Sequence, residues 1–487
     1  QFFDAHQNPL STFSIDVDTA SYANVRRFLT QGQLPPADAV RIEEMINYFS
    51  YDYPQPNWGD AFSIALESAP CPWNPQNNLV LIGLQGKNIQ GQNLPASNLV
   101  FLIDVSGSMA QANKLPLVKE AFKMMANQLR AQDRISIVVY AGSAGLVLDS
   151  ATGADKWTVL SALDRLQAGG STAGGQGIEL AYSIAKKNFV RGGNNRVILA
   201  TDGDFNVGVS SDDELVRLIE GKRNDGIFLS ILGFGMGNYK DSKIEKLADK
   251  GNGTYSYIDT LQEAQKVMVN ELGSMLYTIA KDVKIQVEFN PAQVKAYRLV
   301  GYENRLMAKE DFNDDTKDAG DLGAGHTVTA LYEIIPANAY WNSTPVGNVD
   351  PLKYQATKVK GSSDWMTVKL RYKEPDGFRS RLITRELRKD TIGWQFVSNN
   401  FQFASAVAEF GQLLRNSPYK GNASYQSVIQ RAQGAMGQDP YGYRSEFIGL
   451  VQKASYLSPQ YTNQPIYPPP IPMPATENSQ IQFKGNR

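Results

Sequence analysis

The chain has 487 residues, 48 of them Lys or Arg and 49 of them Asp or Glu, and its formal net charge is −1. This length exceeds one ordinary hydrophobic core, so two or three domains are expected. The balanced charge gives no basic surface for nucleic acid, and the chain lacks the run of about eighteen apolar residues that a membrane span requires. The single cysteine, Cys71, excludes an intrachain disulfide and a zinc site built from cysteines.

The first 96 residues are expected to form an N-terminal segment of strands and helices. Phe13, Ile15 and Val17 alternate with polar residues, which predicts a half-buried strand whose polar face carries Asp16 and Asp18. The later elements expected here are helices at 19–31 and 37–49, strands at 62–66 and 79–82, and a linker at 87–97. Because the chain does not begin with methionine, we also expect a leader before it, which can hold a secretion signal or a lipid anchor.

The clearest pattern lies between residues 98 and 109. Five consecutive apolar residues at 99–103 are typical of a strand in a parallel sheet that is covered on both faces. Asp104, Ser106 and Ser108 follow directly, where such a strand opens into the crevice in which α/β sheets bind ligands. A carboxylate and two hydroxyls suit a hard cation such as Mg²⁺, although Ser-Gly-Ser alone would also suit a helix N-cap.

Two later polar segments are expected at the same edge of the sheet. Thr172 lies in a Gly-Gly-Ser-Thr sequence before a predicted helix, and Asp202 follows a buried strand at 197–200. With both residues in place, the pattern favours a metal site over a plain helix cap. Asp204 and Asn206 come soon after, and a solvated loop is favoured for them over a second contact with the ion.

Strands alternate with amphipathic helices from residue 98 to residue 278. The expected strands are at 99–103, 135–140, 146–148, 197–200, 227–232 and 255–258, and the expected helices include 118–129, 211–219, 241–250 and 261–278. This alternation predicts an α/β domain, a doubly wound sheet between layers of helices, with 146–148 as a short antiparallel edge.

After residue 282 the apolar pattern changes to a period of two. The expected strands are at 283–289, 295–303, 327–335 and 366–372. They predict an antiparallel sheet that forms half of a β-sandwich. Because the N-terminal strands have no sheet of their own before the α/β domain begins, we expect them to pair with these later strands. The α/β domain would then be inserted into the sandwich.

The pattern becomes helical after residue 391, with apolar stripes over 403–414 and 447–454, and the chain ends in a proline-rich tail. The expected division is an N-terminal segment at 1–96, an α/β domain at 97–279, a β-sandwich region at 280–390, a C-terminal helical region at 391–457 and the tail at 458–487.

An acidic stretch at 311–321 invites comparison with a calcium-binding loop. Thr316 stands where the EF-hand pattern requires Gly, and Leu322 stands where it requires the bidentate Glu. A solvated acidic loop is therefore favoured over a calcium site of another kind.

The sequence offers no familiar catalytic constellation. His6 and His326 are the only histidines, one near the terminus and one beside glycines. The chain has no Gly-x-Ser-x-Gly elbow around Ser106, no His-Glu-x-x-His pair and no phosphate-binding loop. Ser106 as a nucleophile would need a base that the sequence does not place. We therefore expect that the protein is not an enzyme.

The polar residues at the predicted sheet edge resemble the metal-ion-dependent adhesion site of the von Willebrand factor type A (VWA) domain. They are Asp104, Ser106, Ser108, Thr172 and Asp202. The resemblance implies that the three hydroxyls bind Mg²⁺, or Mn²⁺ or Ca²⁺, and that the two carboxylates act largely through water. Neutral ligands leave the ion's charge largely uncompensated, so it attracts an Asp or Glu carboxylate of a partner protein. In relatives such as integrins, ligand binding shifts the last helix, which here is 261–278.

Further motifs resemble those of the bacterial YfbK-like VWA family. They are the segments 11–22, 34–36, 41–49, 71–75, 201–208 and 308–320. The resemblance covers nearly the whole chain and implies a VWA domain between an N-terminal segment and a C-terminal domain of unknown function. It also implies an extracytoplasmic protein of a Gram-negative bacterium, in the periplasm, outer membrane or cell surface, and often a lipoprotein. The lipidated cysteine itself is not in this chain.

We therefore expect a divalent-cation-dependent protein-binding or adhesion module at the bacterial cell envelope. Two alternatives stay open, namely an assembly or chaperone-like VWA subunit that works with an ATPase complex and a structural envelope protein with a vestigial metal site. No nucleic-acid partner is expected, and membrane contact is expected only through a lipid anchor.

Overall fold

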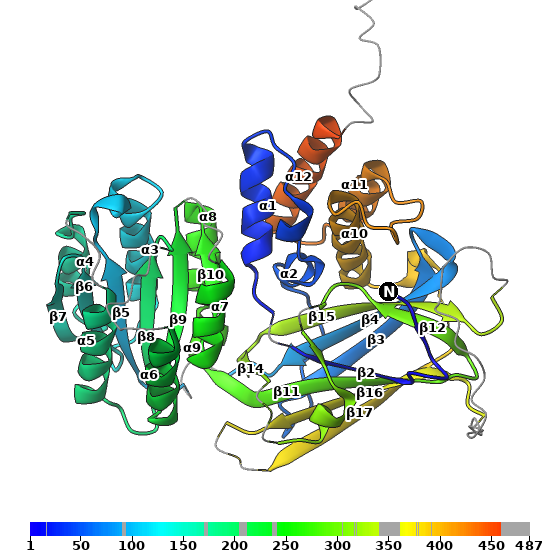
Figure 1. Ribbon diagram of the computed structural model, residues 1–487, viewed down its shortest axis with the longest axis horizontal. Coiled ribbons are helices and arrows are strands. Elements are labelled where there is room, and N and C mark those ends of the chain that lie inside the picture. Colours follow the sequence, from blue (N-terminus) through cyan, green and yellow to red (C-terminus); the bar gives the residue numbers. More distant parts are fainter. Residues whose placement is uncertain are drawn as a thin grey trace, which may run out of the picture.

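The computed structural model combines an α/β unit, a β-sandwich and a layer of helices (Figure 1). It describes residues 1–15, 17–89, 94–169, 174–203, 212–235, 241–303, 305–315, 317, 319–339, 361–375, 377, 379–390 and 392–458. The predicted fold class, α/β with an antiparallel β-sandwich and C-terminal helices, is confirmed. No helix in the described part of the chain is long and apolar enough to cross a bilayer.

A six-stranded sheet forms the centre of the α/β unit, with the strand order β10-β9-β8-β5-β6-β7. The strands are β5 (Ser97–Asp104), β6 (Arg134–Tyr140), β7 (Ala144–Thr152), β8 (Asn194–Thr201), β9 (Ile227–Phe234) and β10 (Tyr255–Ile258). All neighbours pair in parallel except β7, which is the predicted antiparallel edge. Every residue of β5 is buried, which agrees with its apolar sequence.

Helices cover both faces of this sheet (Figure 1). One face carries α3 (Leu115–Gln128), α4 (Lys156–Asp164) and the segment after β10, and the other carries α5 (Gly174–Lys187), α6 (Asp212–Asn224) and α7 (Asp241–Lys250). The helix predicted at 261–278 is instead α8 (Leu261–Gln265), a π-helical turn (Lys266–Asn270) and α9 (Leu272–Leu276). Buried Lys266 pairs with Glu271, five residues later, which is the spacing that a π turn brings together.

Two antiparallel sheets form the β-sandwich, in the orders β1-β12-β15-β4-β3 and β13-β2-β11-β16-β17, with β14 paired to β11. The strands are β1 (Phe3–Asp4), β2 (Leu10–Ser14), β3 (Phe62–Cys71), β4 (Asn74–Gly86), β11 (Thr278–Phe289), β12 (Val294–Leu299), β13 (Leu306–Met307), β14 (Gly320–Gly323), β15 (Thr327–Pro336), β16 (Asp364–Lys373) and β17 (Ser380–Arg388). The inner faces of the two sheets share one core, to which Phe13, Val80 and Ile285 contribute.

The α/β unit is inserted into this sandwich, and the expected strand pairing is observed. β2, which precedes the unit, pairs with β11, which follows it, and places Phe13 opposite Ile285. β4 likewise pairs with β15 and places Leu81 opposite Leu331. Both sheets therefore join segments that are separated by the whole α/β unit.

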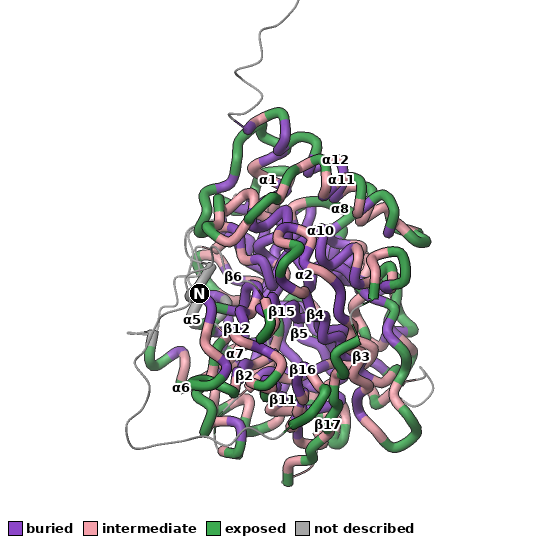
Figure 2. Tube along the Cα trace, turned by 90° about the vertical axis from the view of Figure 1, so that its right-hand side faces the viewer, coloured by how far each residue is buried: buried purple, intermediate pink, exposed green. Residues whose placement is uncertain are grey.

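A layer of helices covers the outer face of the β1-β12-β15-β4-β3 sheet (Figure 1). The helices are α1 (Ala20–Thr30), α2 (Ile42–Asn47), α10 (Asn399–Leu414), α11 (Tyr425–Gly434) and α12 (Tyr443–Leu457). Leu81 of β4 contacts this layer, whereas neighbouring Val80 faces the inside of the sandwich. Buried residues therefore run from the helices into the sheet (Figure 2). Helices from the two ends of the chain therefore share one core. One of them, α11, was not predicted from the sequence.

The prediction for Asp18 is wrong. β2 ends at Ser14, and Asp18 is buried with 6% of its surface exposed rather than solvated. Its carboxylate accepts hydrogen bonds from the backbone N–H of Tyr255 at 3.3 Å and from Arg305 at 3.4 Å. These bonds satisfy the buried carboxylate and join the N-terminal segment to the α/β unit and the sandwich. Asp16 lies outside the described residues.

Candidate functional site

The predicted metal-binding residues that the structure describes meet at the carboxyl edge of the six-stranded sheet. Asp104 ends β5, Ser106 lies just before the 3₁₀ turn that follows (Gly107–Ala110), Ser108 lies within it, and Asp202 directly follows β8. β5 and β8 are adjacent parallel strands, so their carboxyl ends open into the same crevice.

The other predicted residue, Thr172, lies outside the described residues, as do Asp204 and Asn206. Gly169, the last described residue before Thr172, lies beside the site, because its N–H donates a hydrogen bond of 2.7 Å to the carbonyl of Val105.

Asp104 has a carboxylate oxygen that the surrounding protein leaves unsatisfied. Its Oδ1 accepts a 2.8 Å hydrogen bond from the backbone N–H of Ser106, whereas Oδ2 is buried and has no hydrogen-bond partner within the described structure. Burial raises the pKa of the Asp104 carboxyl, and the negative charge of Asp202 adds to this rise, while the bonds from Ser106 and the nearby Tyr140 hydroxyl oppose it. Two carboxylates in such surroundings would be stabilised by a cation between them.

Ser106 and Ser108 place two hydroxyl oxygens side by side. Their Oγ atoms lie 3.1 Å apart, and Ser106 is buried while Ser108 is exposed. This separation is that of a hydrogen bond between the two hydroxyls, and the exposure of Ser108 leaves this side of the site open to solvent.

Asp202 is already paired with a positive charge from the protein. The Lys114 ammonium donates a 2.9 Å hydrogen bond to Asp202 Oδ2, and the exposed fractions of the two side chains are 13% and 3%. Lys114 comes from the loop before α3 and not from the predicted motif. This nearly buried ion pair leaves the Asp202 carboxylate fixed at the carboxyl edge of the sheet.

Two residues of this site were missed by the sequence analysis. Tyr140 ends β6 and lies directly opposite Asp104 in the parallel register. Burial, together with the Asp104 charge, raises the pKa of the Tyr140 hydroxyl well above its ordinary value. Tyr140 could have been predicted, because it ends the strand next to β5 at the same edge of the sheet. Lys114 could not, because a single lysine before a helix is not a recognisable pattern.

The donor set at this edge fits a hard divalent cation. It combines the carboxylates of Asp104 and Asp202 with the hydroxyls of Ser106 and Ser108, all oxygen ligands of the kind that Mg²⁺ prefers. The unsatisfied Oδ2 of Asp104 supplies an independent reason for a cation, since a buried carboxylate oxygen without a donor is costly.

The acidic stretch at 311–321 folds around a lysine. The ammonium group of Lys284, which is 1% exposed, donates to the backbone carbonyls of Asp311, at 3.1 Å, and of Asp314. The Asp315 carboxylate pairs with Arg371 at 3.2 Å. The described part of this loop is therefore more than a solvated turn, because a protein ammonium group occupies the place where a calcium ion would need the carbonyl oxygens.

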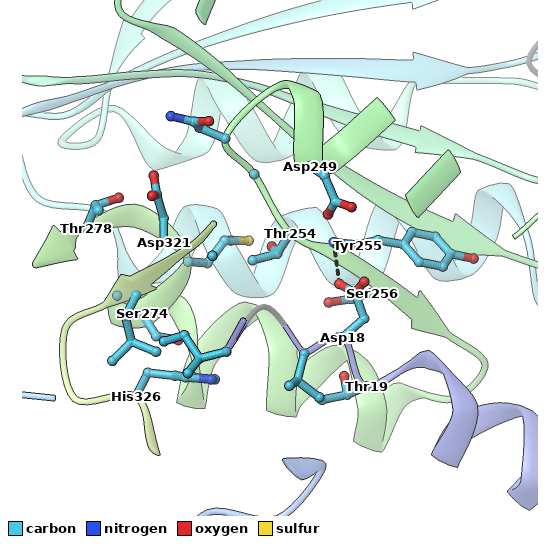
Figure 3. A pocket seen from close by; sticks show the side chains of 18 of the residues that line it. Asp18, Thr19, Asp249, Thr254, Tyr255, Ser256, Ser274, Thr278, Asp321 and His326 are labelled. Carbon is cyan, nitrogen blue, oxygen red and sulfur yellow. Dashed lines mark hydrogen bonds between the residues drawn. The ribbon is translucent and has the colours of Figure 1, made fainter. Parts of the chain in front are cut away.

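A cavity of about 310 Å³ lies where the α/β unit meets the sandwich (Figure 3). Asp18, Asp249, Asp321 and Arg196 are among its lining residues. Burial lowers the pKa of Arg196 to about 10, and its Nε has no hydrogen-bond partner in the described structure. Tyr255, at the amino end of β10, also lines the cavity, which therefore lies at the end of the sheet opposite to Asp104. It is a second candidate site, separate from the first.

Comparison with known families accounts for most of the chain. A von Willebrand factor model matches residues 1–81, a von Willebrand factor type A domain model matches residues 98–270, and a model of the C-terminal part of the uncharacterized protein YfbK matches residues 274–457. The six-stranded sheet between helices and the second of these matches define a VWA-domain protein.

A relative from Escherichia coli (strain K12), named uncharacterized protein YfbK, is 47% identical over 466 residues, which cover 92% of this chain and 78% of the relative. The chain therefore belongs to the YfbK family. An uncharacterized protein of Synechocystis is 29% identical over 170 residues, 34% of this chain and 39% of that protein. Among solved structures, a von Willebrand factor type A protein from Catenulispora acidiphila matches with a TM-score of 0.43 and 16% identity, over 80% of this chain and 89% of that one.

Proposed function

We propose that this protein is a divalent-cation-dependent protein-binding module of the bacterial cell envelope. A cation at the carboxyl edge of the VWA sheet presents an open coordination position to an Asp or Glu side chain of a partner protein. The ion is held by Asp104, Ser106, Ser108, Thr172 and Asp202.

The observation that carries this proposal is the buried Oδ2 of Asp104, which lacks a hydrogen-bond donor in the described structure. The negative charge of nearby Asp202 makes a charged Asp104 carboxylate still less favourable. An ion compensates both carboxylates at once. Hydroxyl ligands from the serines add no negative charge, so the ion keeps enough positive charge to attract a further carboxylate. The exposure of Ser108 supports an approach from solvent.

Mg²⁺ is the proposed resident ion, with Mn²⁺ as the closest substitute. A site with only two carboxylates supports this choice, because Mg²⁺ is usually bound through one or two carboxylates and several waters, whereas Ca²⁺ takes six to eight oxygen ligands. Titration of the purified protein with each ion in a calorimeter tests the order, and tighter binding of Ca²⁺ than of Mg²⁺ would contradict it.

A pull-down from the native envelope fraction tests the binding function. The wild type with Mg²⁺ is compared with the wild type in EDTA, with Asp104→Ala and with Asp225→Ala, a control that removes one exposed carboxylate from the same domain. We expect a partner that is retained by the wild type and the control with Mg²⁺ and lost in the other two samples. A partner held equally in all four would favour the structural alternative, and an ATPase subunit among the retained proteins would favour the assembly alternative.

The envelope location, and a lipid anchor in a leader that precedes this chain, also belong to the proposal. They are supported by the resemblance to the YfbK-like family. Fractionation of cells that express the complete gene product, followed by detergent extraction of the membranes, tests both. Recovery of the protein only in the cytosol would contradict this location and would leave the metal site unaffected.

A further inference from the structure

The ion pair between Lys114 and Asp202 is built into the fold. Lys114 stands immediately before α3, whose first turn begins at Leu115, and its ammonium lies 2.9 Å from Asp202 Oδ2. With 13% and 3% of the two side chains exposed, this is not a solvated surface contact. Most exposed ion pairs contribute little, whereas a pair shielded from water holds its geometry.

The neighbouring strand makes room for the lysine. Gly235, which follows β9, has a φ of +89°, and a Cβ placed there would lie only 2.6 Å from Lys114 Cε. The absence of a side chain at Gly235 therefore lets the lysine stem pass along the sheet edge to Asp202. A glycine at this point serves both the left-handed backbone conformation and the close approach of the lysine.

The lysine and a divalent ion have opposing requirements at this carboxylate. Both need the negative charge of Asp202, and two cations within a few ångströms of each other in a partly buried site repel one another. An ion that draws on Asp202 must therefore weaken its bond to Lys114 or displace the ammonium group.

On the basis of the proposed metal site, we infer that Lys114 is an internal cation that competes with the divalent ion for Asp202. The lysine keeps the Asp202 carboxylate compensated when the ion concentration is low, and it raises the concentration of ion at which the site loads. The threshold for cation-dependent binding is then set by a residue outside the metal-binding motif.

The substitution Lys114→Met tests this inference, because methionine keeps the unbranched apolar stem and removes the charge. We expect it to tighten Mg²⁺ binding about tenfold in calorimetry, the equivalent of one charge-assisted hydrogen bond. In EDTA the same variant should melt at a lower temperature than the wild type, because Asp202 loses its counter-charge, and Mg²⁺ should raise its melting temperature by more than that of the wild type.

Lys187→Met is the matched control, since it removes a lysine from the surface of the same domain, where Lys187 pairs with Asp149. We expect it to leave Mg²⁺ affinity unchanged. Equal affinity of the wild type and Lys114→Met would overturn the inference, and so would weaker binding by the variant, which would make Lys114 a support of the loaded site. If neither protein binds Mg²⁺, the metal site itself is wrong and the proposed function fails with it.

Discussion

Arg26 of α1 and Glu263 of α8 are joined by a 2.7 Å ion pair that fastens the N-terminal helix to the last helical segment of the VWA domain. The Arg26 guanidinium also donates to Asp259 at 3.0 Å and to Glu446 of α12 at 3.2 Å. Tyr48 donates to the same Glu263 at 2.7 Å. One buried arginine therefore holds the VWA domain against helices from both ends of the chain.

The substitution Arg26→Met should lower the free energy of unfolding by about 3–5 kcal/mol, because it leaves three poorly solvated carboxylates without their common counter-charge. Denaturation in urea measures the change. Arg27→Met is the control, since the neighbouring arginine packs over the Phe28 ring, and its loss should cost about 1 kcal/mol or less. Similar losses for both variants would show that the carboxylate cluster does not depend on Arg26.

The defect of Arg26→Met should shrink as the pH falls from 7 to 5. Burial already raises the pKa values of Asp259 and Glu446, and the Arg26 charge opposes that rise, so both pKa values rise further without it. A carboxyl with a raised folded-state pKa binds its proton more tightly in the folded protein than in the unfolded chain. The variant therefore gains stability relative to the wild type as the pH falls through the raised pKa values. A difference in unfolding free energy that is constant over this range would contradict the prediction.

The acidic stretch should not use calcium, because Lys284 already donates to its carbonyl groups. Lys284→Met should lower the free energy of unfolding by about 1–3 kcal/mol, since the carbonyls of Asp311 and Asp314 lose a charged donor. In an Asp104→Ala background, which removes the proposed metal site of the VWA domain, Ca²⁺ should leave the melting temperature of the protein unchanged. A rise of several degrees with Ca²⁺ would instead make the loop a calcium site.

Glu333 should stabilise the contact between the sandwich and the helical layer, because its partner Arg298 also donates a 3.1 Å hydrogen bond to Gln412 of α10. Its buried carboxylate accepts hydrogen bonds from Trp73 at 3.0 Å, Asn77 at 2.6 Å and Arg298 at 2.6 Å. Glu333→Gln should lower the free energy of unfolding by about 3 kcal/mol, because Arg298 is left buried without its charge partner.

Glu288→Gln is the matched control for Glu333→Gln. Glu288 lies in the same sandwich and pairs with Lys369, but half of its side chain is exposed, with a relative exposure of 51%. Its substitution should change the free energy of unfolding by about 0.5 kcal/mol or less. Thermal denaturation of both variants separates the two cases, and equal shifts would argue against a special role for Glu333.

The last segment of the VWA domain should move when the proposed ion site is loaded. The sequence predicted one helix at 261–278, and the structure divides it at the π turn (Lys266–Asn270). This turn directly follows α8, whose Glu263 pairs with Arg26. Hydrogen exchange of residues 261–276 with and without Mg²⁺ measures such a movement. Exchange rates that do not change would contradict this movement.

The local sequence determined the elements around the candidate site. The apolar run at 99–103 predicted a buried parallel strand, and the side chains of Asp104, Ser106 and Ser108 had to emerge where that strand ends. The change to a period of two after residue 282 likewise predicted the strands that receive β2 and β4. Periodicity and strand ends are properties of neighbouring residues, and the sequence displays them directly.

Only the tertiary structure decided which charges meet. Nothing near Lys114 in the sequence pointed to Asp202, 88 residues away, and nothing near Lys284 pointed to the carbonyls of the acidic stretch. The packing of α1 and α2 against the C-terminal helices could not be predicted either. The sequence of each helix shows that it has an apolar face, but not which element packs against that face. Burial makes such pairings matter, since a charge taken out of water must find a counter-charge wherever the fold brings one close.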